Sequence, residues 1–95
     1  MMEPVHPGEI LREDFMTEYG LTAYSLAKAI HVPRDRIESL SRGRRAVTAD
    51  TALRLARYFG NSPQFWLNLQ SHYDLEVARS SVELEVIEPH PGQYS

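Results

Sequence analysis

The sequence contains no cysteine, which excludes a disulfide framework and any thiolate metal site. It has no apolar run near the ~20 residues of a membrane-spanning helix. Its first residues, Met-Met-Glu-Pro-Val-His, lack the basic and apolar regions of a signal peptide. A chain of 95 residues has room for one modest core, which favours pairing with a second copy over a buried active site. We therefore expect one cytoplasmic domain, with no membrane contact.

Metal-binding and catalytic patterns are also missing. The histidines are scattered and form no i,i+4 pair, so no metal site is predicted. They are His6, His31, His72 and His90. The adjacent carboxylates Glu13 and Asp14 would point in different directions on a helix, which argues against an acid–base pair. The sequence thus predicts no catalytic residue and no cofactor, and the chain is not expected to be an enzyme.

Positive charge is scarce overall but concentrated in one stretch. The formal net charge is −3. Residues 34–57 hold seven arginines and three acidic residues, so this stretch carries +4 and the remainder carries −7. One basic stretch inside an acidic protein indicates a single surface that faces an anion. Arginine suits this task because its guanidinium can bind phosphate or guanine through two parallel hydrogen bonds.

Breaking and capping residues divide the chain into five helical segments. They cover roughly residues 8–19, 23–30, 33–42, 49–59 and 63–79. Three hydroxyl residues stand at N-cap positions, namely Thr22, Thr48 and Ser62, and Pro33 and Pro63 are placed at first helical positions. Three glycines follow helical patterns as expected left-handed caps, namely Gly20, Gly43 and Gly60. The predicted fold class is therefore all-α.

Residues 22–42 have the pattern of a helix-turn-helix motif. Two short helices are separated by a turn too short for any other structure, and apolar residues at helical spacing would lock them at a fixed angle. These are Leu26, Ala27, Ile30, Val32, Ile37 and Leu40. Such a motif inserts its second helix into the DNA major groove, with the N-terminal residues leading. The residues expected to read bases are Arg34, Asp35, Glu38 and Ser39.

Other polar residues of this region are expected to contact DNA phosphates. Arginines surround Gly43 just beyond the second motif helix, and hydroxyl residues begin the first. The predicted phosphate contacts are Thr22, Ser25, Arg36, Arg42, Arg44 and Arg45. The alternative is a solvated face on which the arginines form i,i+4 pairs with Glu38 or Asp35.

The fifth helical segment carries apolar residues over more than one face. A one-sided surface helix needs a stripe only ~100° wide, so this helix should bury surface in its own domain and against something else. Phe65 and Trp66 are adjacent and diverge by about 100°, so one should face the core and the other a dimer mate. The predicted dimer interface comprises Phe65, Trp66, Leu69 and Tyr73. A twofold dimer would place two recognition helices about 34 Å apart, one turn of DNA.

The last residues differ from the rest. Val82, Leu84 and Val86 alternate with glutamates, which is strand periodicity, and two prolines follow. Residues 80–95 are predicted to be an acidic extended or disordered tail beyond a helix-turn-helix domain of residues 1–79. The tail is either frayed or an added strand on the sheet edge of a basic partner protein.

The span from His6 to Ala78 resembles the HigA/VapI family of antitoxins in the XRE-type helix-turn-helix superfamily. The matching segments are HPGEIL at 6–11, LAKA at 26–29, VPR at 32–34, TADTALRLA at 48–56 and SPQFWLNLQ at 62–70. One departure is His31, where many relatives place glycine in the turn. The resemblance implies a five-helix, lambda-repressor-like fold and a dimer that represses its own operon and neutralises a RelE-like mRNA-cleaving toxin.

Two other functions remain open. The chain could be a solitary XRE-type regulator without a toxin, for which the DNA argument is identical. It could also be a helical protein-interaction module whose arginines bind an acidic partner. The expected DNA partner is an operator palindrome, and a shifted band with upstream DNA would exclude the interaction module.

Overall fold

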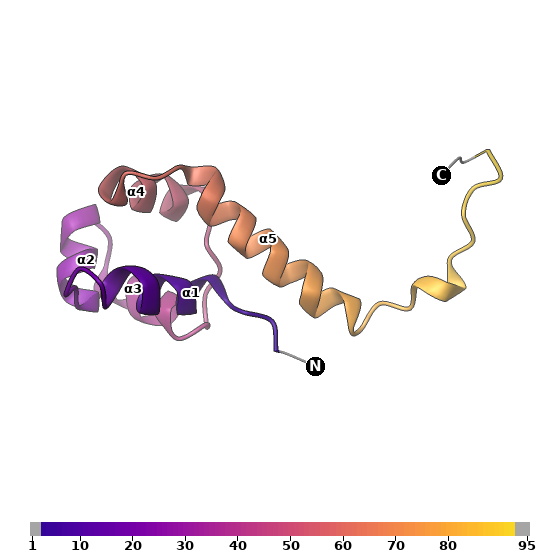
Figure 1. Ribbon diagram of the computed structural model, residues 1–95, viewed down its shortest axis with the longest axis horizontal. Helices are drawn as coiled ribbons and strands as arrows, with labels where there is room; N and C mark the ends of the chain where they lie inside the picture. Colours follow the sequence, from indigo (N-terminus) through magenta and orange to yellow (C-terminus); the bar gives the residue numbers. More distant parts are fainter. Residues whose placement is uncertain (1–2, 93–95) are drawn as a thin grey trace.

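The computed structural model describes residues 3–92, and every regular element in this part of the chain is a helix (Figure 1). The elements are α1 (Pro7–Ile10), η1 (Leu11–Met16), α2 (Ala23–Ile30), α3 (Arg34–Ser41), α4 (Ala49–Phe59), α5 (Pro63–Arg79) and a 3-10 turn, η2 (Leu84–Val86). α1 and η1 form one continuous helix, because the residues that join them, Ile10 and Leu11, are both helical. The five-helix, all-α architecture predicted from the sequence is confirmed.

Side-chain caps explain why three helices begin where the sequence predicts. Thr22, Thr48 and Ser62 each accept a hydrogen bond from the backbone N–H three residues ahead, at 3.0, 3.3 and 3.0 Å. Gly60 ends α4 in the left-handed conformation, with φ of 77°. The observed bounds of α2, α4 and α5 therefore agree with the predicted segments.

The first helix differs from its prediction. It spans Pro7–Met16 instead of residues 8–19, and its second part, η1, is π-helical. The wider turn gives the N–H of Thr17 the carbonyl of Arg12, five residues back, at 3.0 Å. Leu11 and Met16, also five residues apart, are both buried as a result. A period of 3.6 residues could not predict this spacing.

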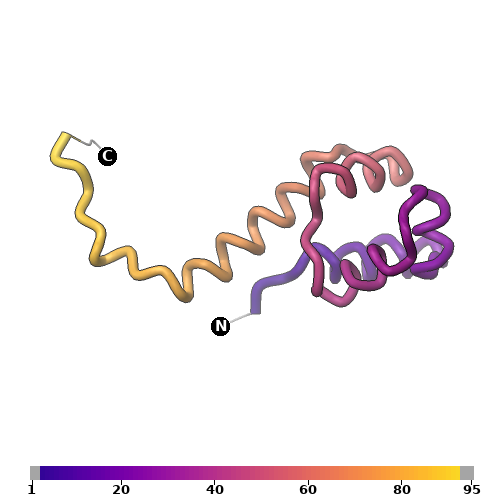
Figure 2. The backbone as a smooth tube through the Cα atoms, turned by 180° about the vertical axis from the view of Figure 1, so that it is seen from behind, coloured from indigo at the N-terminus to yellow at the C-terminus, as the bar shows by residue number. Residues whose placement is uncertain are grey.

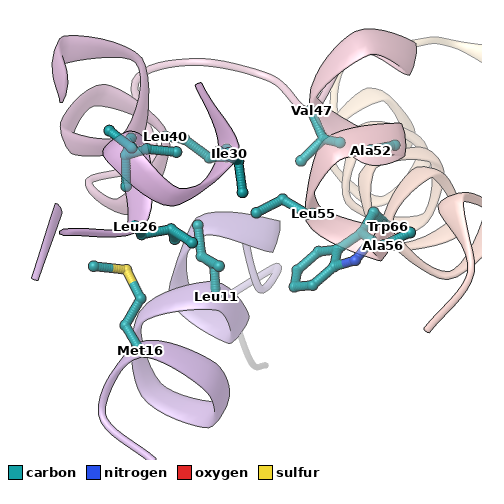
Figure 3. Packing of buried hydrophobic residues seen from close by; sticks show 12 residues of the cluster. Leu11, Met16, Leu26, Ile30, Leu40, Val47, Ala52, Leu55, Ala56 and Trp66 are labelled. Carbon is teal, nitrogen blue, oxygen red and sulfur yellow. The ribbon is translucent and has the colours of Figure 1, made fainter. Parts of the chain in front are cut away.

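The core lies between the first helix, the α2–α3 pair and α4 with the start of α5. Leu11, Leu55 and Trp66 come from η1, α4 and α5, and their side chains converge there (Figure 3). All three are fully buried. Leu26 of α2 and Ile37 of α3 belong to the same buried cluster, so the core joins these two helices to the others.

α5 extends well beyond the body that these helices form around the core, and the tail leads farther away from it after bending upward at the end of α5 (Figures 1 and 2). The molecule measures 54 × 26 × 21 Å as a result. Trp66 and Gln70 are buried, whereas Leu75 and Val77 farther along α5 are 56% and 43% exposed. Among residues 3–92, no helix combines the length and the apolarity needed to cross a membrane.

The strand periodicity of the tail does not produce a strand in the described residues. Leu84–Val86 form the 3-10 turn η2, closed by a hydrogen bond from the N–H of Ile87 to the carbonyl of Leu84 at 3.0 Å. Val82 and Val86 are 49% and 72% exposed. A strand needs a neighbour to satisfy its backbone groups, and no second strand is present within residues 3–92.

Candidate nucleic-acid interface

α2, a tight turn and α3 form the predicted helix-turn-helix. Thr22 and Ser25 cap α2 reciprocally: each side-chain oxygen accepts the backbone N–H of the other residue. His31 ends α2 with φ of 62° and ψ of 48°, the left-handed conformation that glycine usually supplies. The motif therefore forms with histidine at this position. Pro33 has an extended backbone and occupies the N-cap position of α3. The prediction that it is the first helical residue is therefore wrong by one position.

The angle between α2 and α3 is fixed by buried apolar side chains. Leu26, Ala27 and Ile30 of α2 and Ile37 and Leu40 of α3 are at most 4% exposed. The sixth predicted member, Val32, lies in the turn and packs against this cluster while partly exposed. This set, predicted from the sequence, holds α3 with its other face turned outward.

The outer face of α3 carries the four predicted base-reading residues. Arg34 and Asp35 are exposed, and Glu38 and Ser39 are partly exposed. Arg34 Nη2 lies 2.9 Å from Glu38 Oε2, and Arg45 Nη2 lies 3.6 Å from Asp35 Oδ2. Such solvent-exposed pairs contribute about 0–1 kcal/mol each, so a nucleic-acid ligand can replace them at small cost. Of the i,i+4 pairs in the alternative interpretation, Arg34–Glu38 is present, whereas Asp35 pairs with Arg45 of the following loop, and both pairs leave the outer face of α3 exposed.

The loop after α3 carries the predicted phosphate contacts Arg42, Arg44 and Arg45, all exposed. Gly43 takes φ of 75°, and the next N–H, that of Arg44, donates to Ser39 O at 2.8 Å. The end of the loop is tied to α5, because the N–H of Val47 donates to the buried Gln70 Oε1 at 2.7 Å. The arginines therefore project from a loop with a fixed backbone. Sequence reasoning missed this use of Gln70.

The hydroxyl groups of Thr22 and Ser25, also predicted phosphate contacts, are already engaged with each other. Thr22 Oγ1 donates to Ser25 Oγ at 3.1 Å, and Ser25 Oγ donates to Thr22 O at 3.1 Å. Both hydroxyls serve the cap of α2 first. A phosphate at this helix start would have to compete for them or bind backbone N–H groups.

Three arginines form hydrogen bonds between helices of the chain itself. Arg36 Nη1 donates to Asp50 Oδ2 at 2.5 Å, so the predicted phosphate contact Arg36 is occupied by a carboxylate of α4. Arg54 Nη1 donates to the carbonyls of Ile30 and His31 at 2.8 and 3.2 Å, at the C-terminus of α2. Arg12 Nη1 donates to Ser41 O at 2.5 Å, at the C-terminus of α3. No local pattern in the sequence indicates these contacts.

The four predicted dimer residues differ in exposure. Trp66 is fully buried in the chain's own core, and this corrects its assignment to the dimer interface. Phe65 is 37% exposed, and Leu69 and Tyr73 are partly exposed. Tyr73 packs edge-on against His6, with ring centroids 4.8 Å apart. Phe65, Leu69 and Tyr73 remain the predicted contact surface.

His6 ties the start of α1 to α5. Its Nδ1 accepts a hydrogen bond from the N–H of Gly8 at 2.8 Å, which requires that nitrogen to be unprotonated. Desolvation lowers the pKa of His6 from its ordinary value of 6.5, and the charge of Asp74 opposes this with a smaller effect. Folding therefore favours the neutral imidazole.

Acidification should weaken the fold through His6. The pKa of His6 is lower in the folded chain than its ordinary value of 6.5. The stability that the neutral imidazole contributes is therefore fully present above the unfolded pKa and is lost as the pH falls through the lower, folded pKa. We expect the free energy of unfolding, measured with urea, to fall as the pH is lowered from neutral through this range. His6→Asn keeps an N-cap acceptor without a titrating group, so it should reduce this slope. Equal slopes for both proteins would contradict the assignment.

Two helices joined by a tight turn, the second with an exposed polar face, define the helix-turn-helix class of proteins. A family model described as helix-turn-helix matches residues 11–66. The chain is 56% identical over 77 residues to virulence-associated protein I of Dichelobacter nodosus, covering 81% of this chain and 71% of that protein. It is 39% identical over 82 residues to antitoxin HigA-1 of Vibrio cholerae, covering 86% and 77%.

A solved structure described as Pseudomonas aeruginosa antitoxin HigA with the higBA promoter is also similar. It is 40% identical, the match covers 96% of this chain and all of that chain, and the TM-score is 0.86. The chain belongs to the XRE-type helix-turn-helix family. Within this family it is similar to the proteins named HigA and virulence-associated protein I. The resemblance stated from the sequence is thereby confirmed.

Proposed function

We propose that this protein is a sequence-specific DNA-binding antitoxin that represses its own operon. The observation that carries the proposal is the outer face of α3, which is polar, exposed and held rigidly from behind by Ile37 and Leu40. A 40% identical relative with this fold has a solved structure together with its promoter. By this proposal α3 enters the major groove and the loop arginines meet the backbone.

The division of labour between α3 and the loop is testable. Arg34→Ala should relax specificity at one base position per half-site and cost about 1–3 kcal/mol there, because alanine cannot form a bidentate hydrogen bond with guanine. Arg44→Ala should weaken binding to all sequences alike and lower the salt slope by about 1 for each phosphate that is no longer neutralised. Both effects are measured by titrating each variant with operator and scrambled duplexes at several salt concentrations. A change of base preference alone in Arg44→Ala would reverse the assigned roles.

The DNA-binding unit is proposed to be a twofold homodimer formed through α5. Phe65, Leu69 and Tyr73 lie on α5 near the body and retain exposed surface. A dimer of this kind would set two α3 helices about 34 Å apart and match a palindromic operator. Sedimentation equilibrium of wild type and of Phe65→Asp tests it. An unchanged dimerisation constant for the variant would exclude this interface.

The toxin partner is proposed to be a RelE-like mRNA-cleaving protein. Two relatives carry the name HigA antitoxin, and this supports a toxin partner for the present chain. Co-expression of the tagged chain with the product of the neighbouring reading frame tests it through co-purification and rescue of growth. The same test with residues 80–95 deleted asks whether the acidic tail adds a strand to the toxin. Retained affinity would assign the tail no role in this interaction.

A mobility-shift assay with the duplex upstream of the chain's own gene tests the DNA proposal. A shifted band that survives excess scrambled duplex is expected. DNA binding without toxin binding would identify a solitary regulator. The absence of any shifted band at moderate salt would overturn the DNA proposal and favour an interaction module for an acidic partner.

A further inference from the structure

Asp50, at the start of α4, connects two arginines of the basic stretch. Its Oδ2 accepts Arg36 Nη1 at 2.5 Å and Arg54 Nε at 3.0 Å. The Asp50 side chain is 54% exposed, so it contributes these polar contacts and no core packing. Hydrogen bonds from Arg36 and then Arg54 lower the pKa of this carboxyl group from its ordinary value of 3.8, so it stays charged at neutral pH.

The two arginines connect Asp50 to opposite sides of the tight turn between α2 and α3. Arg54 extends from α4 to the carbonyls of Ile30 and His31, which have no partner within α2 because they lie at its C-terminus. Arg36 belongs to the first turn of α3, just after the tight turn of the motif. A continuous chain of polar contacts thus runs from the end of α2 through Arg54, Asp50 and Arg36 to α3.

This polar chain supplies what the apolar core does not. α3 packs on α1 and α2, and α4 packs on α2 and α5. The core therefore fixes α3 from behind, whereas the side of α3 that bears Arg36 is linked to α4 by the carboxylate. The Arg36 side chain is only 28% exposed, so its guanidinium is committed to this link.

We propose that Asp50 is a positioning residue, which holds Arg36 and Arg54 on one carboxylate oxygen and so keeps the side of α3 that the apolar core leaves unsupported in the orientation for reading bases. The inference rests on the proposed DNA binding. Exposed ion pairs contribute little to stability, so the effect is expected in the discrimination between sequences and not in the melting temperature.

Asp50→Asn separates positioning from simple charge. Removal of one negative charge should strengthen binding to scrambled duplex, because the basic surface gains net charge. Removal of the brace should lower the ratio of operator to scrambled affinity about tenfold, within the range for one displaced base contact. Asp14→Asn makes the same chemical change at an exposed position of η1 and should keep the ratio. Equal strengthening of both duplexes by Asp50→Asn would overturn the proposal.

Arg54→Lys removes the charge explanation altogether. Lysine keeps the net charge but has one ammonium group, which cannot hold Asp50 and two carbonyls in the same arrangement. The specificity ratio should fall as in Asp50→Asn, while the salt dependence of binding should match wild type. A wild-type ratio in Arg54→Lys would overturn the proposal.

A DNA-free measurement keeps the two proposals distinguishable. Hydrogen exchange of the Val32 amide, which donates to Ala27 O at 3.0 Å across the turn, should be faster in both variants than in wild type. If wild type binds the upstream duplex no better than scrambled duplex, the proposed function fails, and faster exchange still supports the brace. If wild type discriminates and both variants exchange like wild type, the brace fails alone.

Discussion

Replacing Trp66 with alanine is expected to lower the free energy of unfolding by about 3–5 kcal/mol. Trp66 is fully buried and packs against Phe15 and Phe65, with ring centroids 4.9 and 5.1 Å away. Its removal would leave a cavity where η1, α4 and α5 meet (Figure 3). Small domains have a total stability of about 5–15 kcal/mol, so this change would remove a large part of it. Urea unfolding followed by circular dichroism, at fixed protein concentration, measures the loss.

Trp66→Phe is the matched control. It keeps an aromatic ring in the core but lacks the indole N–H, which donates to Asn61 Oδ1 at 2.9 Å. The expected cost is about 1–2 kcal/mol, from one hydrogen bond and a smaller void. Equal losses for the two variants would mean that the hydrogen bond, and not the packing, dominates.

Gly8→Ala is expected to destabilise the protein by about 3 kcal/mol or more, as severe overpacking does. Gly8 is buried in α1, and an added Cβ would lie 1.7 Å from the carbonyl oxygen of Leu40. That atom belongs to the backbone of α3, so relief of the clash requires α1 to move away from α3. Urea unfolding of the variant measures the loss of stability. Its mobility-shift band with the upstream duplex should also be weaker than that of wild type.

Gly20→Ala separates overpacking from the general effect of replacing glycine. Gly20 has φ of 64°, and nothing lies within 4 Å of an added Cβ there. Its cost is backbone strain alone, about 1–2 kcal/mol for one left-handed residue. Similar losses at positions 8 and 20 would show that α1 yields easily and that the close approach to α3 is unimportant.

The helices that the sequence predicts best are those whose ends carry chemical signals. Thr22, Thr48 and Ser62 act locally as caps, so the starts of α2, α4 and α5 follow from the neighbouring residues alone. The buried set of the motif followed in the same way from helical spacing. The predicted base-reading residues lie together on the outer face of α3, and their contacts with bases remain a prediction.

What the sequence could not reveal depends on contacts between distant residues. The arginines 12, 36 and 54 look alike in composition, yet their partners lie 29, 14 and 23–24 residues away. Arg12 and Arg54 also pair with Glu13 and Asp50 nearby, but no local pattern indicates the long-range contacts. The close approach of Gly8 to Leu40 likewise exists only once α1 and α3 are packed.

The alternation of the tail is not expressed as a strand in the chain alone. Alternating valine, leucine and glutamate satisfies the side-chain rule for a strand, but backbone pairing needs a neighbour that the described residues do not provide. The alternation in residues 82–86 therefore left the backbone free to form a 3-10 turn.

Because the outer part of α5 and residues 80–92 bury none of the core side chains, this arm is free to diverge while the body stays the same. Changes in the arm leave the core side chains in place, whereas substitutions at Leu11, Leu55 or Trp66 alter the core itself. Under the proposed function, sequence change confined to the arm would alter contacts with protein partners and leave the DNA-binding body intact.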